Sequence, residues 1–188
     1  MSRVGIIEYL KGSRSDDRFK HIMGVVSVAG QLARQEGYDQ GRVELAGLLH
    51  DLAKGLATVQ LKELLAQSGW VVDQIEMEVP ELLHAPVGAY LALTEFGIND
   101  PEILEAIRYH TIGSPEMGLL ARIIYIADYI EPNRSFPGLE EIRNLAGQGI
   151  EAALIAITGN IIKYNIERGR IVHPNTLLLR NSCLRRTT

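Results

Sequence analysis

The sequence contains almost no cysteine, and this scarcity limits the kinds of site that it can build. Cys183 is the single cysteine among 188 residues. One thiol forms no internal disulfide and offers no cysteine-ligated zinc site. The first 17 residues contain no long apolar run and no clear signal-peptide cleavage site. We therefore expect a protein of a reducing, cytoplasmic compartment.

An excess of positive charge and long apolar runs are also missing. The formal net charge is −4, which disfavours a broad basic surface for nucleic acid but still allows a small positive pocket. The apolar segment 117–130 contains Arg122 and Asp128 and is too short to span a bilayer. We therefore expect neither a nucleic-acid partner nor a membrane.

Strand patterns and two common catalytic motifs are absent as well. Only segments 69–77 and 170–179 are doubtful as strands, and neither a G-x-S-x-G nor a Walker A sequence occurs. Apolar residues recur instead at helical spacing, and Asp100-Pro101 is a typical helix start. The expected helices cover 16–37, 41–55, 58–69, 85–97, 101–110, 114 to before 132, and 150–169. These patterns predict an all-α, compact fold, with one domain over residues 1–188.

Ionisable residues gather near the ends of several expected helices. His50 and Asp51 lie one turn before Gly55 in the apolar segment "AGLLHDLAKG", His110 lies just before Gly113, and Asp128 lies one turn before Pro132. Such groups are costly to bury unless a partner compensates them. Individually, each histidine has an ordinary core or surface role available, and each aspartate has a cap or ion pair. Together they form a set of nitrogen and oxygen donors without thiolate, which suits iron, manganese, cobalt or zinc.

Six ordered segments resemble one known family. They are "RFKHIMGV", "LLHDLAKG", "LLHAPVGAYLA", "DPEILEAIRYHTIG", "IIYIADYIEPNRSFPG" and "IVHPNT". Together they are similar to HD-domain metal-dependent phosphohydrolases of the YqeK type, the symmetrical bis(5′-nucleosyl)-tetraphosphatases. The likeness covers about residues 15–182 and implies a compact HD-domain helical bundle.

The resemblance also implies a metal centre. A transition metal, with iron expected first, would be held by His21, His50, Asp51 and Asp128. His84 and His110 would hold either a second metal, with Asp51 as the bridge, or a substrate phosphate. The centre is thus mononuclear or dinuclear on this basis.

Further residues are candidates for catalysis and substrate binding. Lys54 shares a helix face with Asp51, and the planar guanidinium of Arg134 suits a bidentate phosphate contact. We assign catalytic roles to Asp51, Lys54 and Arg134, although Lys54 and Arg134 also have surface roles available. Thr111 offers a hydroxyl to phosphate or simply ends a helix. Arg170 and His173 either line the nucleoside end of the pocket or belong to an ordinary loop.

The resemblance implies an enzyme that cuts diadenosine tetraphosphate symmetrically into two ADP. The alternatives are another HD-type nucleotide phosphohydrolase or phosphomonoesterase, or a metal-dependent nucleotide sensor. The expected partner is a small nucleotide, and a homodimer is left open.

Overall fold

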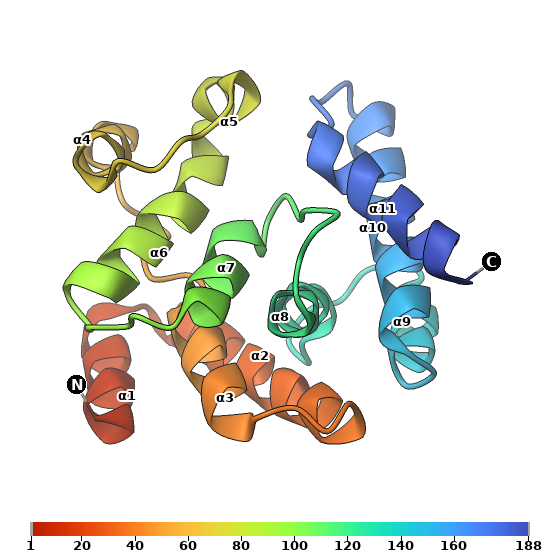
Figure 1. The fold of residues 1–188 in the computed structure, drawn as a ribbon, viewed down its shortest axis with the longest axis horizontal. Coiled ribbons are helices and arrows are strands. Elements are labelled where there is room, and N and C mark those ends of the chain that lie inside the picture. The colour runs from red at the N-terminus through yellow and green to blue at the C-terminus, as the bar shows by residue number, and fades with distance from the viewer. Residues whose placement is uncertain (1, 188) are drawn as a thin grey trace.

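The structure, a computed structural model, describes residues 2–187, and these residues form helices without any strand. Figure 1 shows the helices gathered around α8, which is seen end-on near the centre. The elements are α1 (Arg3–Ser13), α2 (Asp16–Gln35), α3 (Gln40–Leu49), α4 (Thr58–Ser68), α5 (Gln74–Glu78), the 3₁₀-helix η1 (Pro80–Leu83), α6 (His84–Thr94), α7 (Pro101–Tyr109), α8 (Leu119–Ile130), α9 (Leu139–Ala146), α10 (Ile150–Glu167) and α11 (Pro174–Thr187). The predicted all-α bundle is confirmed.

Helix starts follow local capping chemistry. The side chain of Ser15 accepts a hydrogen bond from the Arg18 N–H at the start of α2. The side chain of Asp100 does the same for Glu102 N–H at the start of α7, where Pro101 occupies the first turn. These bonds satisfy N–H groups that have no partner inside the helix. Both starts are where the sequence predicts them.

Two helix boundaries differ from the prediction by more than three residues. The expected helix 41–55 ends at Leu49, and residues 50–55 form tight turns. His50 Nδ1 lies 2.8 Å from the Gly47 carbonyl, the oxygen that the Asp51 N–H would use in a continuing helix. The segment at Ser114 is a turn, because Met117 N–H bonds to Ser114 O, and α8 begins only at Leu119.

The sequence-based prediction does not include four of the helices: α1, α5, α9 and α11. The doubtful stretch 170–179 is a loop followed by the start of α11. In α11, Leu179 and Cys183 are fully buried one turn apart. Their burial depends on packing against α10, and the local sequence does not reveal this partner.

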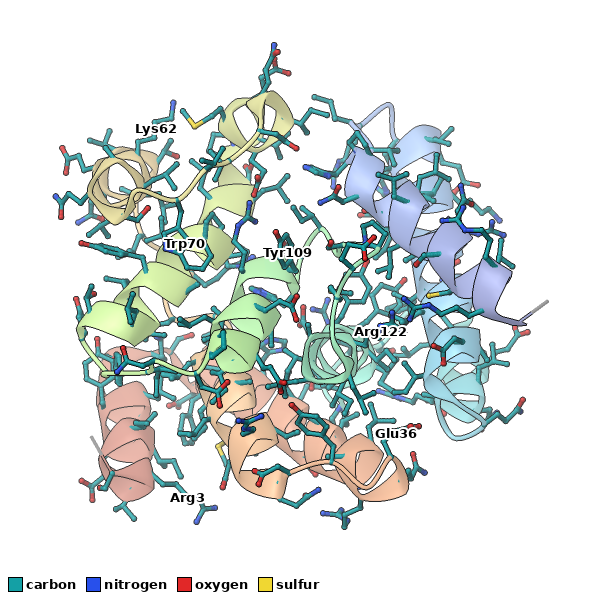
Figure 2. All side chains as sticks on the ribbon, in the orientation of Figure 1. Arg3, Glu36, Lys62, Trp70, Tyr109 and Arg122 are labelled. Carbon is teal, nitrogen blue, oxygen red and sulfur yellow. The ribbon has the colours of Figure 1, made fainter. Side chains whose placement is uncertain are left out.

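The hydrophobic core centres on α8. Ile123, Ile124 and Ile126 are fully buried, and α8 packs against α2, α3, α7 and α10. Such all-round burial explains why α8 is apolar on most of its faces. Side chains fill the space between these helices in Figure 2, where Arg122 and Trp70 are labelled. None of the described helices is long and apolar enough to cross a membrane.

Candidate metal centre

Five elements bring six ionisable side chains together at one end of α8. His21 comes from the second turn of α2, His84 from the first residue of α6, and Asp128 from the last turn of α8. The other three follow the ends of α3 and α7: His50, Asp51 and His110. His50, Asp51, His84 and His110 are all at most 3% exposed. Residues up to 107 positions apart in the chain thus meet in one buried cluster.

Asp51 lies between two pairs of histidines. Its Oδ1 atom is 3.2 Å from His84 Nε2 and 3.5 Å from His110 Nε2. Its Oδ2 atom is 3.6 Å from both His21 Nε2 and His50 Nε2. Each carboxylate oxygen therefore faces its own pair of imidazoles. Asp128 Oδ1 adds a further oxygen 3.3 Å from His21 Nε2.

Backbone contacts fix which nitrogen of each buried histidine faces the cluster. His50 Nδ1 and His110 Nδ1 each lie 2.8 Å from a carbonyl, those of Gly47 and Ile107, and His84 Nδ1 lies 2.5 Å from Glu81 O. A carbonyl only accepts, so each Nδ1 donates the proton. In the neutral imidazoles the Nε2 lone pairs therefore point inward.

The inward-facing nitrogens come close to one another. His21 Nε2 and His50 Nε2 are 3.3 Å apart, and His84 Nε2 and His110 Nε2 are 3.1 Å apart. Unprotonated nitrogens in such pairs repel each other unless a cation or proton lies between them. The donor set consequently fits a metal ion, and its nitrogen and oxygen composition matches that of iron, manganese, cobalt or zinc.

The charge states of the cluster suit cation binding. Burial lowers the pKa of His50 to about 4 and also lowers the pKa of His84, so both rings are neutral at pH 7. Burial alone would raise the pKa of the Asp51 and Asp128 carboxyls, but the facing imidazoles in their protonated form, and for Asp128 also the Arg134 guanidinium, hold both well below the usual range. Metal ligands have to be deprotonated, and these residues meet that condition near neutral pH.

His21 differs from the other histidines. Its Nδ1 atom lies 3.2 Å from Glu131 Oε1 instead of a carbonyl. Burial lowers the pKa of His21, but Asp128 and Glu131 outweigh it and raise the pKa overall. Without a cation, His21 is therefore the ring that most readily holds a proton. The Glu131 carboxylate orients the ring so that Nε2 faces the cluster.

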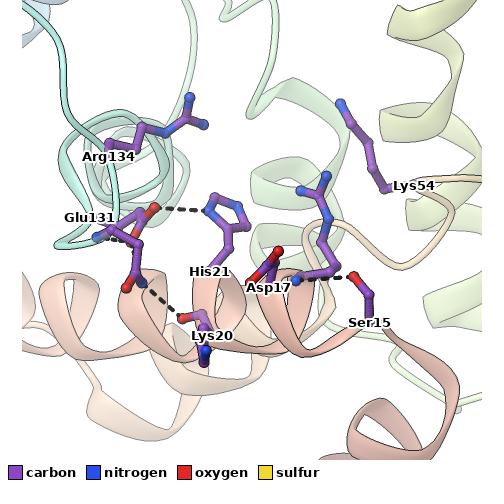
Figure 3. A pocket seen from close by; sticks show the side chains of 9 residues that line it. Ser15, Asp17, Lys20, His21, Lys54, Glu131 and Arg134 are labelled. Carbon is purple, nitrogen blue, oxygen red and sulfur yellow. Dashed lines mark hydrogen bonds and ion pairs between the residues drawn. The ribbon is translucent and has the colours of Figure 1, made fainter.

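An open cavity of about 730 Å³ leads to the His21 side of the cluster. Figure 3 shows Arg134 and Lys54 on opposite sides of this cavity, with His21 between them. Arg134 donates to Asp128 through one Nη2 contact of 2.7 Å, and Lys54 Nζ lies 3.4 Å from His84 Nε2. Arg18 Nη1 is 2.5 Å from Asp51 Oδ2. Several cationic side chains therefore line a cavity that reaches the cluster at His21.

Residues 18–133 match the model of the HD domain. The chain belongs to the HD-domain family.

Several known proteins are similar to this chain over nearly its whole length. The "Bis(5'-nucleosyl)-tetraphosphatase, symmetrical" of Bacillus subtilis is 40% identical over 181 residues, covering 96% of this chain and 97% of the relative. The enzyme of the same name from Staphylococcus aureus is 35% identical, covering 86% of this chain and 84% of the relative. A crystal structure of a predicted HD superfamily hydrolase involved in NAD metabolism, from Clostridium acetobutylicum, has a TM-score of 0.95, 38% identity, and coverage of 99% and 98%. The predicted family resemblance is confirmed.

The fold brings together most residues that the sequence marks as candidates. His21, His50, Asp51, His84, His110 and Asp128 share the cluster, and Lys54 and Arg134 line the cavity beside it. Asp128 pairs with Arg134, whereas Arg122 pairs with Glu151. The roles of these residues in binding metal and substrate belong to the proposal below.

Three other candidate residues are absent from both the cluster and the lining of its cavity. The Thr111 hydroxyl is buried and has no hydrogen-bond partner among residues 2–187. Arg170 is exposed, and its guanidinium lies 5.7 Å from the ring centre of Tyr164. His173 is buried, with Nε2 at 2.9 Å from Asp73 Oδ2. Arg170 and His173 therefore contact different side chains, and a role for either at a nucleoside stays a prediction.

Two residues of the site are missing from the sequence-based prediction. Arg18 contacts Asp51, and Glu131 contacts His21. Arg18 precedes His21 by three positions on α2, so helical spacing places both side chains on one face of that helix. The same argument does not hold for Lys54, because residues 50–55 form turns. Glu131 lies just beyond the end of α8, where helical spacing no longer applies. Gly24 lets it approach, since a Cβ there would lie 2.6 Å from Glu131 Oε2.

Proposed function

We propose that this protein hydrolyses dinucleoside tetraphosphates symmetrically and converts diadenosine tetraphosphate into two ADP. The observation that supports this activity is the near full-length similarity to proteins named as symmetrical bis(5'-nucleosyl)-tetraphosphatases. The buried donor set and the cationic cavity are what hydrolysis of a phosphoanhydride requires. No serine or cysteine nucleophile motif is needed, because water is the attacking group.

The proposed metal ligands are His21, His50, Asp51 and Asp128, with iron as the first expectation. His84 and His110, together with Asp51 Oδ1, form a second trio of donors whose ligand atoms lie within 4.8 Å of one another. This trio would take a second cation or a substrate phosphate. A bound metal ion of this class acidifies water and offsets the negative charge of phosphoryl oxygens.

Residues of the chain supply the remaining electrostatics. Lys54 and Arg134 line opposite sides of the cavity and would bind phosphate oxygens of the substrate. Arg18 neutralises Asp51 in the cation-free protein, and a cation at Asp51 would release its guanidinium for a phosphate. In a partly buried cavity, such contacts stabilise developing charge more strongly than they would in water.

The reaction consumes one water and breaks one phosphoanhydride bond. The water oxygen attaches to the phosphorus of one half while the bridging oxygen leaves with the other half, so both products are ADP. Hydrolysis in heavy-oxygen water should therefore place one label in one ADP of each pair. The position of this cut in the centre of the phosphate chain rests on the similarity to the named relatives.

Product analysis with a panel of nucleotides tests the proposal directly. Protein loaded separately with iron, manganese, cobalt or zinc is incubated with diadenosine tetraphosphate, and the products are separated. ADP alone supports the proposal. Equal amounts of AMP and ATP would indicate asymmetric cutting, phosphate release from mononucleotides alone would indicate a phosphomonoesterase, and binding without products would indicate a sensor. Each of the last three results would contradict it.

A further inference from the structure

A single arginine on α9 holds the turn that follows α8. The Arg143 Nε atom donates to the Ile130 carbonyl at 3.0 Å, and its Nη2 atom donates to the Glu131 carbonyl at 2.8 Å. Ile130 is the last residue of α8, so its carbonyl has no partner further along that helix. The planar guanidinium thus fixes two neighbouring carbonyls at once, as its fork of donors allows.

The turn held by Arg143 carries two side chains that face the metal-ligand cluster. Residues 131–134 form this turn, closed by a hydrogen bond of 3.1 Å from the Arg134 N–H to the Glu131 carbonyl, the oxygen that Arg143 also binds. The Glu131 carboxylate contacts His21, and Arg134 lines the open cavity. Arg143 is absent from the lining of that cavity, so its influence on the site has to pass through the turn.

The turn is exposed, so polar anchors hold it in place of burial. Pro132, Asn133 and Arg134 all lie at the surface. On the α2 side, the Asn133 amide donates to the Lys20 carbonyl at 3.2 Å. On the α9 side, a cavity of about 350 Å³ lies between Pro132 and Arg143, so packed side chains do not fill the space there. The guanidinium of Arg143 therefore anchors the turn on a side where packing does not.

We propose that Arg143 is a positioning residue for the hydrolysis, because it fixes the turn 131–134 and thereby places the Arg134 guanidinium for a substrate phosphate. This inference rests on the proposed function, in which Arg134 binds phosphate. Charged donors stabilise a reacting group best when they are held in place before it arrives. One contact from Arg134 to phosphate is worth about 30-fold in rate. An effect that passes through Arg134 alone cannot exceed this limit.

An arginine at the other end of α8 provides a structural comparison. Arg122 Nε donates to the Met117 carbonyl at 2.8 Å, and Arg122 Nη1 lies 2.9 Å from Glu151 Oε1. Arg122 thus joins the segment before α8 to the start of α10, whereas Asp128 is in the last turn of α8. A substitution of Arg122 removes comparable anchoring contacts without touching the turn 131–134.

Binding and kinetics of the metal-loaded, full-length protein test the proposal. The binding probe is a diadenosine tetraphosphate analogue with a methylene at the central bridge, and the kinetic substrate is diadenosine tetraphosphate itself. Arg143→Lys keeps the charge but replaces the planar fork by a point charge, so its effect reports geometry. Glu140→Gln alters the carboxylate that Arg143 Nη1 contacts and leaves both carbonyl contacts in place. It serves as the matched control, beside Arg122→Lys.

Arg143→Lys should weaken analogue binding and lower kcat/KM by about tenfold at full metal loading, since a small misplacement of a binding group has effects of this size. In the Arg134→Ala background the same substitution should change either value less than about twofold, because the group that Arg143 positions is then gone. Glu140→Gln and Arg122→Lys should bind and react as the wild type does, although Arg122→Lys should lower the melting temperature.

Wild-type binding and kcat/KM in Arg143→Lys would overturn the proposal. A tenfold loss that persists in the Arg134→Ala background would also overturn it, because Arg143 would then act by another route. An equal loss in Arg122→Lys would reduce Arg143 to a contribution to general stability, with the same consequence. Melting curves show whether each variant is folded, and Arg143→Gln replaces Arg143→Lys if the latter is not.

Failure of the proposed function has a different signature. Wild-type protein would then produce no ADP from diadenosine tetraphosphate, and both proposals would fall together. An active wild type whose Arg143 variants bind and react normally would remove only the positioning role of Arg143.

Discussion

Two groups of histidine and carboxylate in this protein have similar spacing but different chemistry. In the cluster around Asp51, three histidines have Nδ1 next to a backbone carbonyl, so their Nε2 lone pairs face inward. In the group of Asp73, Glu76 and His173, whose ligand atoms also lie within 4.8 Å of one another, the arrangement is reversed. His173 Nδ1 accepts a hydrogen bond from the Asn175 N–H, so Nε2 carries the proton.

Charge differs between the two groups as well. Glu76 already has a cationic partner, since Arg108 Nη2 lies 2.7 Å from its Oε2 atom and both side chains are buried. A metal ion there would meet a protonated imidazole nitrogen and a neighbouring guanidinium. Proximity of donor atoms is therefore not enough to make a metal site, because the backbone partner of each histidine decides whether its inward-facing nitrogen has a free lone pair.

The largest expected effect separates the two groups by mutation. Asp51→Asn should remove bound metal and reduce hydrolysis by more than about 100-fold, because it alters the carboxylate shared by both histidine pairs. Loss of a residue that only hydrogen-bonds to a metal ligand already lowers metal affinity or activity by about 10–100-fold. Asp73→Asn is the matched control and should keep both metal and activity. Elemental analysis and ADP production check the pair. Metal loss in Asp73→Asn, or full metal loading of Asp51→Asn, would show that the Asp73 group binds the metal or that the Asp51 cluster does not.

Acid should destabilise the metal-free protein through its buried imidazoles. The pKa of His50 is about 4 in the folded protein and about 6.5 when unfolded. Between these values the unfolded chain binds more protons, so stability falls as pH decreases from 6.5 to 4, by about 3 kcal/mol over the whole window. Urea titrations at several pH values measure the slope. His50→Gln should show a smaller slope, and an equal slope would contradict this explanation.

Metal removal should lower the melting temperature of the loaded protein. A cation at 100 times its dissociation constant stabilises the fold by about 2.7 kcal/mol, which corresponds to roughly 5–10 °C for a chain of this length. Chelator should produce this shift in the wild type and in Asp73→Asn, but not in Asp51→Asn. Calorimetry with verified metal content tests it. A chelator shift that survives in Asp51→Asn would indicate binding at another group.

The cations of the cavity should affect catalysis and leave the metal in place. Lys54→Ala and Arg134→Ala each remove one charge-assisted contact to phosphate, worth about 2 kcal/mol, so hydrolysis should fall about 30-fold. Lys62→Ala, at an exposed lysine on α4, is the control. Unchanged hydrolysis rates in both Lys54→Ala and Arg134→Ala, at full metal loading, would show that neither residue takes part in catalysis.

The smallest effect concerns the contact that orients His21. Glu131→Gln weakens the acceptor for His21 Nδ1, and metal affinity should fall about tenfold, the low end for an outer partner of a ligand. Competition with a coloured chelator measures the affinity. Gly24→Ala pushes on the same carboxylate and should act in the same direction. If both variants retain wild-type affinity, Glu131 has no part in positioning the ring.

Local sequence determined the class of this fold and the starts of several helices. Asp100 and Pro101 begin α7 through contacts within three residues, and Ser15 begins α2 in the same way. Such signals act over one turn, so they need no knowledge of the fold. Helices such as α11 were missed because Leu179 and Cys183 gain their burial from distant elements.

The candidate ligands were available from the sequence through its ordered motifs, but their arrangement was decided by the tertiary structure. The fold alone directs Asp51 Oδ1 to His84 and Oδ2 to His21, because these atoms meet only where the turn after α3 faces α2 and the start of α6. The sequence equally shows a histidine at positions 50 and 173. Contacts within three residues orient both rings, through the Gly47 carbonyl for His50 and the Asn175 N–H for His173. Only the tertiary structure decides what each Nε2 atom then faces, because helix packing brings His21 to within 3.3 Å of His50 Nε2 and Asp73 to within 2.9 Å of His173 Nε2.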